Sequence, residues 1–406
     1  MDTPSRRRLL AVLGGITGVT SVAGGSYWLW RDVSECPTSL EATHGYTNGS
    51  FNIWSEPVFT DGRAYVSEGT GIIRFSSDTR QFRLFALDDR GEPQWVTRLE
   101  LQGGIGRPLI TANQVVVPTG GNTMVGCDRQ TGRIQWTLDA GNNDDGHMSS
   151  VAVGHDDHIL VVTNEPEAHG LSGGSHLLSV STSGEIEWTT EVDAVSRGLA
   201  LQEELVVVAT RDGPVGGFNP DTGGRQWSTD LDGTVGSQSM PVWFDDQLWI
   251  PREDGLVDGL DPANGAPQTQ FGELIELDDD SLSNVTPAVA VDDERLLIGS
   301  NDGSVAAYGP NLNQQWEYDG GTQIAAIDTI DHRIAVLDQR GQYTELDAET
   351  GEAERSFLLV DRQRKDWCGF DSSSERFRGL AAMSRQSIVV TGRMFGTQFF
   401  RLPRRE

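Results

Sequence analysis

One short phrase recurs along the chain and constrains its fold more than any other feature. At 128–136 it reads DRQTGRIQW, an acid followed by a Thr-Gly turn and a tryptophan. Further copies, strong or weak, occupy 88–95, 181–188, 219–227, 261–267, 309–316 and 347–352. Seven copies at a near-constant period indicate an array of similar structural units.

The residues before each copy predict short strands separated by turns. The second strand of each unit is almost continuously apolar, as in QVVV at 114–117 and LVVV at 205–208, which indicates burial on both faces. Eight such units follow one another, each of roughly forty to fifty residues. Four-stranded sheets with neighbours on both faces are the blades of a propeller, whose radial closure protects the sheet edges. We therefore predict an all-β, eight-bladed propeller of four-stranded antiparallel blades, with seven blades as the alternative.

The recurring phrase has a structural interpretation. We expect its turn to join the third strand of a blade to the fourth, and its tryptophan to pack between adjacent blades. A buried tryptophan contributes roughly 150–250 Å² of mostly apolar area. The residues predicted to dock the blades are Trp95, Gly132, Trp136, Trp188, Gly223, Trp227, Trp316 and Gly351.

The two ends of the chain predict how the ring closes. The last unit ends after its third strand, and the segment at about 40–47 belongs to no unit, so we expect it to supply the missing fourth strand of blade eight. This divides the chain into a signal or membrane anchor (1–30), a linker with the closing strand (31–50) and the propeller (51–406).

These repeats resemble the pyrroloquinoline-quinone-type β-propeller repeat, with its Ala-x-Asp-x-x-Thr-Gly-x-x-x-Trp hallmark, over about 350 of the 406 residues. Some proteins of that superfamily are quinone-dependent dehydrogenases, which carry adjacent paired cysteines and a calcium site. Others, such as the lipoprotein of the bacterial outer-membrane assembly machine, are scaffolds without a cofactor. Cys36, Cys127 and Cys368 are not adjacent. We expect a non-catalytic binding or scaffold protein without a cofactor; the alternative is a quinone- or metal-dependent oxidoreductase or hydrolase.

The N-terminus predicts export. Residues 5–10 (SRRRLL) resemble the twin-arginine export motif through Arg6 and Arg7, and the uncharged 22-residue stretch 9–30 is long enough to cross a bilayer. The aromatic YWLW at 27–30 favours an uncleaved anchor, whereas small residues near Ala23 offer a cleavage site. In both cases the protein lies outside the cytoplasm.

Charge excludes one class of partner. The net charge is −29, and Lys365 is the only lysine among 31 basic residues, a composition that resembles proteins of salt-loving archaea. Such a surface repels nucleic acid. His155 and His158, and the acidic stretches 142–146 and 278–280, could ligate a metal ion. We interpret them as turns and solvated loops, and predict no metal site.

The long connections, at 67–81, 138–148, 164–175, 271–283 and 359–377, should all leave from one face, which is either a binding surface or a permissive edge. The last of them holds the candidate partner-binding residues Arg362, Arg364, Lys365, Trp367, Arg376 and Arg378, whose alternative role is an internal clamp against carboxylates.

The cysteines give the last prediction. Cys36 and Cys368 should both lie beside blade eight, outside the cytoplasm where disulfides persist, so we predict that they form one. The alternative is two unrelated free thiols. Cys127 falls in a small apolar third strand and is predicted to be a buried free thiol.

Overall fold

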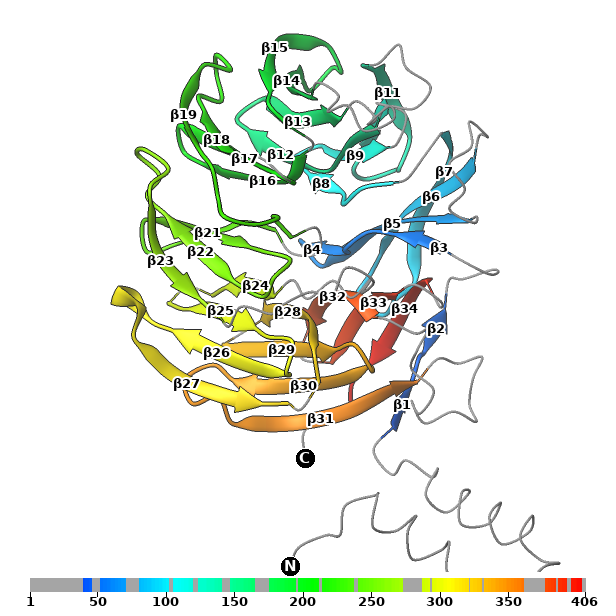
Figure 1. Ribbon diagram of the computed structural model, residues 1–406. Helices are drawn as coiled ribbons and strands as arrows, with labels where there is room; N and C mark the ends of the chain where they lie inside the picture. The colour runs from blue at the N-terminus through cyan, green and yellow to red at the C-terminus, as the bar shows by residue number, and fades with distance from the viewer. Residues whose placement is uncertain are drawn as a thin grey trace, which may run out of the picture.

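Eight four-stranded sheets surround a central axis in the computed structural model of the chain (Figure 1). The structure describes residues 39–45, 52–70, 80–101, 105–119, 123–140, 147–164, 175–194, 196–211, 214–236, 240–272, 287–292, 294–320, 322–330, 332–360, 377–384, 386–392 and 396–403. The prediction of an eight-bladed β-propeller is confirmed, and the seven-bladed alternative is wrong.

The strands follow one another from the inside of each blade to the outside. In chain order, blade 1 consists of β4 (Val58–Thr60), β5 (Arg63–Thr70), β6 (Arg80–Leu87) and β7 (Pro93–Leu101), blade 2 of β8 (Leu109–Ile110), β9 (Gln114–Thr119), β10 (Thr123–Asp128) and β11 (Ile134–Asp139), and blade 3 of β12 (His147–His155), β13 (His158–Asn164), β14 (Ser175–Ser181) and β15 (Ile186–Val192). Blade 4 consists of β16 (Ser196–Gln202), β17 (Leu205–Thr210), β18 (Val215–Phe218) and β19 (Arg225–Thr229), blade 5 of β20 (Val242–Phe244), β21 (Gln247–Pro251), β22 (Val257–Leu260) and β23 (Pro267–Phe271), and blade 6 of β24 (Ala288–Val291), β25 (Leu296–Gly299), β26 (Ser304–Tyr308) and β27 (Gln314–Asp319). Blade 7 consists of β28 (Ile324–Ile330), β29 (Arg333–Asp338), β30 (Gln342–Asp347) and β31 (Ala353–Val360), and blade 8 of β32 (Phe377–Ser384), β33 (Ser387–Gly392) and β34 (Gly396–Arg401). A short 3₁₀ turn, η1 (Pro310–Leu312), precedes β27, and β3 (Asn52–Trp54) pairs with β5.

The N-terminal segment closes the ring, as predicted. β2 (His44–Gly45) pairs antiparallel with β34 and completes blade 8. The segment also makes a contact that the sequence did not predict, because β1 (Ser39–Glu41) pairs in parallel with β31 as a fifth strand on blade 7. Ala42, between the two strands, is buried in the hydrophobic cluster that joins blades 7 and 8. The segment therefore binds both blades.

The hydrophobic core lies between the blades rather than inside them. The described residues form eight buried clusters, and each cluster joins two neighbouring blades of the ring. The apolar second strands make this possible, since β9 and β17 are buried along their whole length. Each blade is stable only against its neighbours, which is the physical reason for the repeat.

The recurring phrase forms the contact from one blade to the next. Trp95 of β7 packs on Gly132 in the turn of blade 2, and its indole N–H donates to the carbonyl of Arg129 at 3.1 Å. Gly132 has a φ of +70°, and a Cβ there would lie 2.4 Å from the Trp95 ring. Asp128 holds the turn by accepting hydrogen bonds from the backbone and hydroxyl of Thr131, which lower the pKa of its carboxyl. The other tryptophan–glycine pairs are Trp136–Gly184, Trp188–Gly223, Trp227–Gly265 and Trp316–Gly351.

Three blade interfaces use other residues. Between blades 5 and 6, Trp249, Phe271 and Tyr308 stack with ring centroids 5.3 and 4.1 Å apart. Between blades 8 and 1, the ring of Phe399 occupies the space beside Gly91. Between blades 7 and 8, Arg355 stands where other blades have tryptophan.

A buried ion pair accounts for that last exception. Trp95, Trp136 and Trp227 pair across strands with a small residue, Ala86, Gly126 and Gly217 respectively. In blade 7 the corresponding pair is Glu345 and Arg355, which are joined by two hydrogen bonds. Arg355 also donates to the carbonyl of Pro403 of blade 8 at 2.8 Å, so it reaches the next blade as a tryptophan does.

Candidate functional site in the central channel

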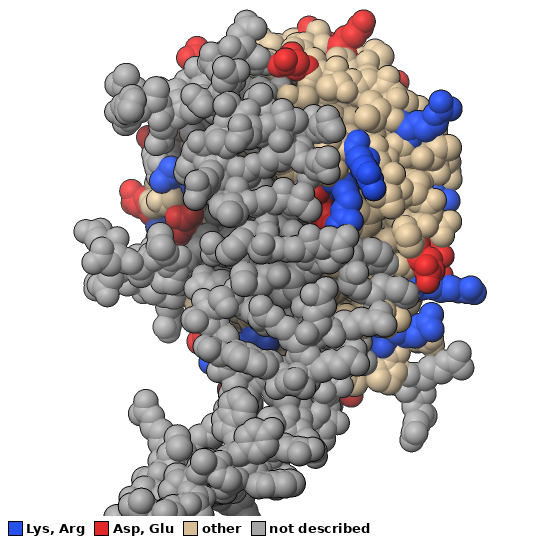
Figure 2. All heavy atoms as spheres, turned by 90° about the vertical axis from the view of Figure 1, so that its right-hand side faces the viewer, with Lys and Arg blue, Asp and Glu red and all other residues tan. Residues whose placement is uncertain are grey.

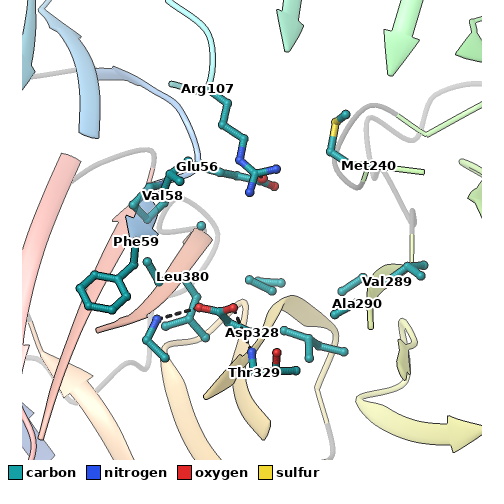
Figure 3. A pocket seen from close by; sticks show the side chains of 18 of the residues that line it. Glu56, Val58, Phe59, Arg107, Met240, Val289, Ala290, Asp328, Thr329 and Leu380 are labelled. Carbon is teal, nitrogen blue, oxygen red and sulfur yellow. Dashed lines mark hydrogen bonds and ion pairs between the residues drawn. The ribbon is translucent and has the colours of Figure 1, made fainter. Parts of the chain in front are cut away.

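A cavity of about 380 Å³ lies on the axis of the ring (Figure 3). The described residues that line it come from the inner strands β4, β20, β24, β28 and β32 and from the segments just before β4, β8 and β20. Much of the wall consists of small apolar residues, namely Ala288, Ala290, Ala325, Ala326, Gly379 and Ala381. Small side chains keep the channel open where the inner strands come closest to the axis.

Asp328 is the carboxylate set deepest in this wall. One of its oxygens accepts the backbone N–H of Ala382 on β32 at 2.8 Å, and the other accepts the N–H of Thr329 at 2.9 Å. It thereby links the inner strands of blades 7 and 8. Burial raises the pKa of Asp328 above its ordinary value, against the opposing effects of these hydrogen bonds and of the Arg107 charge.

A second charged group faces the same cavity. Glu56, just before β4, and Arg107, just before β8, form an ion pair between blades 1 and 2, with Nε and Oε2 3.8 Å apart. Their side chains keep 37% and 40% of their surface exposed, so the pair is well hydrated and weak. Glu56 raises the pKa of Asp328 and Arg107 lowers it, which shows that the three groups share one electrostatic environment. The described lining of the channel can therefore offer a ligand one cation and two carboxylates.

A further buried charged cluster lies in the outer part of blade 7. The carboxylate of Glu345 accepts hydrogen bonds from Arg355, Arg333 and the hydroxyl of Tyr343. Burial, followed by the Glu345 charge, raises the pKa of Tyr343 well above its usual value. Arg333, Tyr343 and Arg355 form hydrogen bonds and ion pairs with partners within blade 7 or blade 8, so we interpret the cluster as structural.

The histidine pair of the sequence does not form one site. His155 and His158 lie opposite each other at the turn between β12 and β13. His155 pairs with Asp221 of blade 4 at 3.2 Å, whereas His158 pairs with Glu187 of its own blade. Among the residues that the structure describes, no group of histidine, cysteine and carboxylate side chains is arranged to hold a metal ion.

Cys127 is buried, and burial raises the pKa of its thiol to about 11, so it stays protonated at neutral pH. Several other predicted residues fall outside the described part of the chain: Arg6, Arg7, Cys36, Arg362, Arg364, Lys365, Trp367, Cys368 and Arg376. Arg378 lies in β32, but its side chain is not described. The stretches 142–146 and 278–280 and most of the long connections also fall outside it, and no helix in the described part is long and apolar enough to span a membrane.

Sequence reasoning missed the channel residues. Asp328 had one visible signal, since it is the only charge in the otherwise apolar strand IAAIDTI at 324–330. Glu56 and Arg107 had none, because only ring closure brings blades 1, 2 and 7 around one axis.

The fold defines a class of protein, the β-propellers of the pyrroloquinoline-quinone type. The chain belongs to the family described as outer membrane protein assembly factor BamB, whose model matches residues 29–160 and 142–357. No curated protein matches the sequence.

Solved structures share the fold at low sequence identity. BamB from Moraxella catarrhalis is 16% identical with a TM-score of 0.57, over 88% of this chain and 99% of that one. The computationally designed Ika8 protein is 15% identical with a TM-score of 0.61, over 90% and 100%. The quinohemoprotein alcohol dehydrogenase ADHIIG from Pseudomonas putida HK5 is 11% identical with a TM-score of 0.59, over 91% and 78%.

Proposed function

We propose that this protein is a non-catalytic binding or scaffold propeller that works outside the cytoplasm and is held at the membrane by its N-terminal segment. The observation that carries the proposal is its membership of a family described as an outer membrane protein assembly factor, over most of the propeller. An assembly factor has to bind a protein, so we propose a protein partner. The export motif and the uncharged stretch at 9–30 support the location.

The chemistry of Asp328 supports a binding role over catalysis. Each of its oxygens already accepts a backbone N–H, and one of these bonds joins two blades. A carboxylate fixed in this way serves to link the inner strands of blades 7 and 8. Using it as a general base would compete with both hydrogen bonds.

The partner is proposed to bind the face from which the long connections leave. The strands of each blade alternate in direction, so connections between second and third strands leave from the same face as connections between blades. One of the two longest of these, from the end of β31 to the start of β32, contains Trp367 and several basic residues. Tryptophan and arginine contribute more than most residues to protein interfaces.

A second candidate function is a quinone-dependent oxidoreductase. The channel has the size of a small-molecule site. A buried carboxyl with a raised pKa beside an arginine is also typical of catalytic sites. Glu56, Arg107 and Asp328 are the charged groups that would meet such a cofactor.

Adding pyrroloquinoline quinone and calcium to the full chain distinguishes the two functions. A cofactor at a hundred times its Kd stabilises the folded state by about 2.7 kcal/mol, which is readily seen as a rise in Tm. The scaffold proposal predicts an unchanged Tm and an unchanged quinone absorbance spectrum. A Tm rise in the natural protein that disappears in Asp328→Asn would overturn it.

A further inference from the structure

The charge of the ring is divided unequally between its two sides. Residues 141–360, which contain blades 3 to 7, hold 41 acidic residues and 8 arginines, a net charge of −33. Residues 52–140 and 361–406, which contain blades 1, 2 and 8, hold 15 acidic and 19 basic residues, a net charge of +4. Blades 8, 1 and 2 are neighbours because the ring closes between blades 8 and 1. The protein is thus acidic on one side only.

The N-terminal segment joins the ring at blades 7 and 8, at the border between the acidic side and the side with blades 8, 1 and 2. β1 and β2 lie at the outer edges of blades 7 and 8, next to blade 1 (Figure 1). Figure 2 looks onto this side, where both arginine and acidic side chains stand among uncharged residues on the described surface. Only eight residues separate the end of the uncharged stretch 9–30 from β1, and they span at most about 28 Å. A membrane-anchored chain must therefore keep the outer edges of blades 7 and 8 close to the lipid.

Blades 1 and 2 present exposed apolar residues beside arginines. Val96 of β7 is 51% exposed and Ile134 of β11 is 49% exposed, two of the three exposed large hydrophobic residues in the described chain. Arg98 projects from the same side of β7 as Val96, since both are exposed and alternate with the buried Trp95 and Leu99, which face inward. Arg133 precedes Ile134 and is also exposed. We term Val96, Arg98, Arg133 and Ile134 the rim surface.

The two arginine–aliphatic pairs of the rim surface lie on the outer strands of neighbouring blades or directly beside them. The hydroxyl of Thr97, which lies between Val96 and Arg98, donates to the carbonyl of Gly132. Gly132 directly precedes Arg133 and packs against Trp95. This contact docks β7 on the turn before β11, while Val96 and Arg98 project from the other face of β7. Asp128 interacts electrostatically with Arg133, and Asp139 lies at the other end of β11.

Blade 3 provides an internal comparison. Ile186, the third exposed hydrophobic residue, stands two residues before Trp188, just as Ile134 stands two residues before Trp136. Its neighbours in the chain are Glu185 and Glu187. The same backbone thus presents an aliphatic residue with arginine in blade 2 and with glutamate in blade 3.

We propose that the rim surface is the part of the propeller that contacts an anionic lipid membrane, so that most of the acidic side, blades 3 to 6, points away from it. Arginines near an anionic lipid surface each strengthen attachment by about fivefold, and exposed aliphatic residues bury area at the interface. The opposite orientation would bring a net charge of −33 towards the same lipids. This inference rests on the membrane attachment in the proposed function.

The test is hydrogen exchange measured by mass spectrometry on the full chain in nanodiscs of neutral or of anionic lipid. It is run at the lowest salt concentration at which circular dichroism shows the chain to be folded, because salt screens the attraction. We expect β7 and the start of β11 to exchange more slowly in anionic than in neutral nanodiscs, and β15 to exchange equally in both. Equal exchange of β7 and β11 in the two lipids, or slower exchange of β15 instead, would overturn the proposal.

Matched variants separate the rim surface from a general effect of charge. Arg133→Glu and Arg225→Glu change the net charge equally, and Arg225 lies on blade 4. Arg133→Glu should abolish the slower exchange while Arg225→Glu preserves it; Ile134→Ser should weaken it while Ile186→Ser does not. Effects of equal size within each pair would contradict the proposal.

Failure of the membrane attachment itself has a different signature. A chain that incorporates into neither kind of nanodisc refutes the anchor. Flotation of that chain with preformed anionic vesicles then tests lipid binding by the rim surface independently of the anchor. We expect vesicle binding to be at least fivefold weaker in Arg133→Glu. The proposal would be overturned if the chain does not float with the vesicles. It would also be overturned if Arg133→Glu leaves vesicle binding unchanged, the result expected when this surface binds an acidic protein partner instead.

Discussion

Two glycine substitutions measure how much the contact between neighbouring blades contributes to stability. Gly132 and Gly62 both have positive φ angles, +70° and +74°. A Cβ on Gly132 would lie 2.4 Å from the ring of Trp95, whereas a Cβ on Gly62 has no atom within 4 Å. Gly62→Ala therefore changes only the backbone energy, and Gly132→Ala changes the backbone energy and the docking of the tryptophan.

The expected magnitudes follow from these contacts. Placing alanine at a positive φ costs roughly 1–2 kcal/mol, offset by about 0.4–1 kcal/mol from the reduced freedom of the unfolded chain. Displacing the buried Trp95 adds about 1–3 kcal/mol for overpacking. Loss of its hydrogen bond to Arg129 adds about 0.5–1.5 kcal/mol. We expect about 0.5–1 kcal/mol for Gly62→Ala and about 2–5 kcal/mol for Gly132→Ala.

The assay is thermal unfolding of both variants at one fixed salt concentration. An unfolding entropy of about 2.1 cal/mol/K per residue over roughly 350 residues makes each kcal/mol worth about 1.4 °C in Tm. Gly62→Ala should lower Tm by about 1 °C and Gly132→Ala by roughly 3–7 °C. Equal losses at the two positions would refute the argument that glycine is required there by the tryptophan.

Three further predictions concern charge and export. The pKa of Asp328 is raised in the folded protein, so its ionised form costs stability at neutral pH, and this cost disappears as the pH falls towards 4. On acidification the Tm of the natural protein should therefore rise relative to the Tm of Asp328→Asn. A difference in Tm between the two proteins that does not change with pH would contradict this. Changing Arg6 and Arg7 together to lysine should trap the protein inside the cell, and unchanged export would exclude the twin-arginine route. Lowering the salt concentration should lower Tm, because 60 carboxylates then repel one another unscreened; a Tm independent of salt would oppose this reasoning.

The repeat predicted the propeller because each copy carries its own structural reason. Gly132 is glycine since a tryptophan of the preceding blade covers it, and Asp128 is an acid since it accepts the hydrogen bonds of its own turn. Both features are local, so they can be read from one copy and counted in the others. Their number, together with the short last unit, predicted the blade count and the closing strand.

The features that the sequence did not reveal depend on residues far apart in the chain. The parallel pairing of β1 with β31 joins positions about 320 residues apart. Glu345 and Arg355 replace the usual small residue and tryptophan of a blade, a change that is interpretable only once the strand register is known. The channel residues Glu56, Arg107 and Asp328 come from three blades and share no motif.

Cross-linking in native membranes tests the central claim, that this propeller is a membrane-held binding module, most directly. The full chain is cross-linked in intact cells, and the linked peptides are identified by mass spectrometry. The account predicts one reproducible protein partner, linked to this chain through the connections between second and third strands or between blades, including 361–376. Links confined to the opposite face, or no reproducible partner together with quinone-dependent activity of the purified chain, would contradict it.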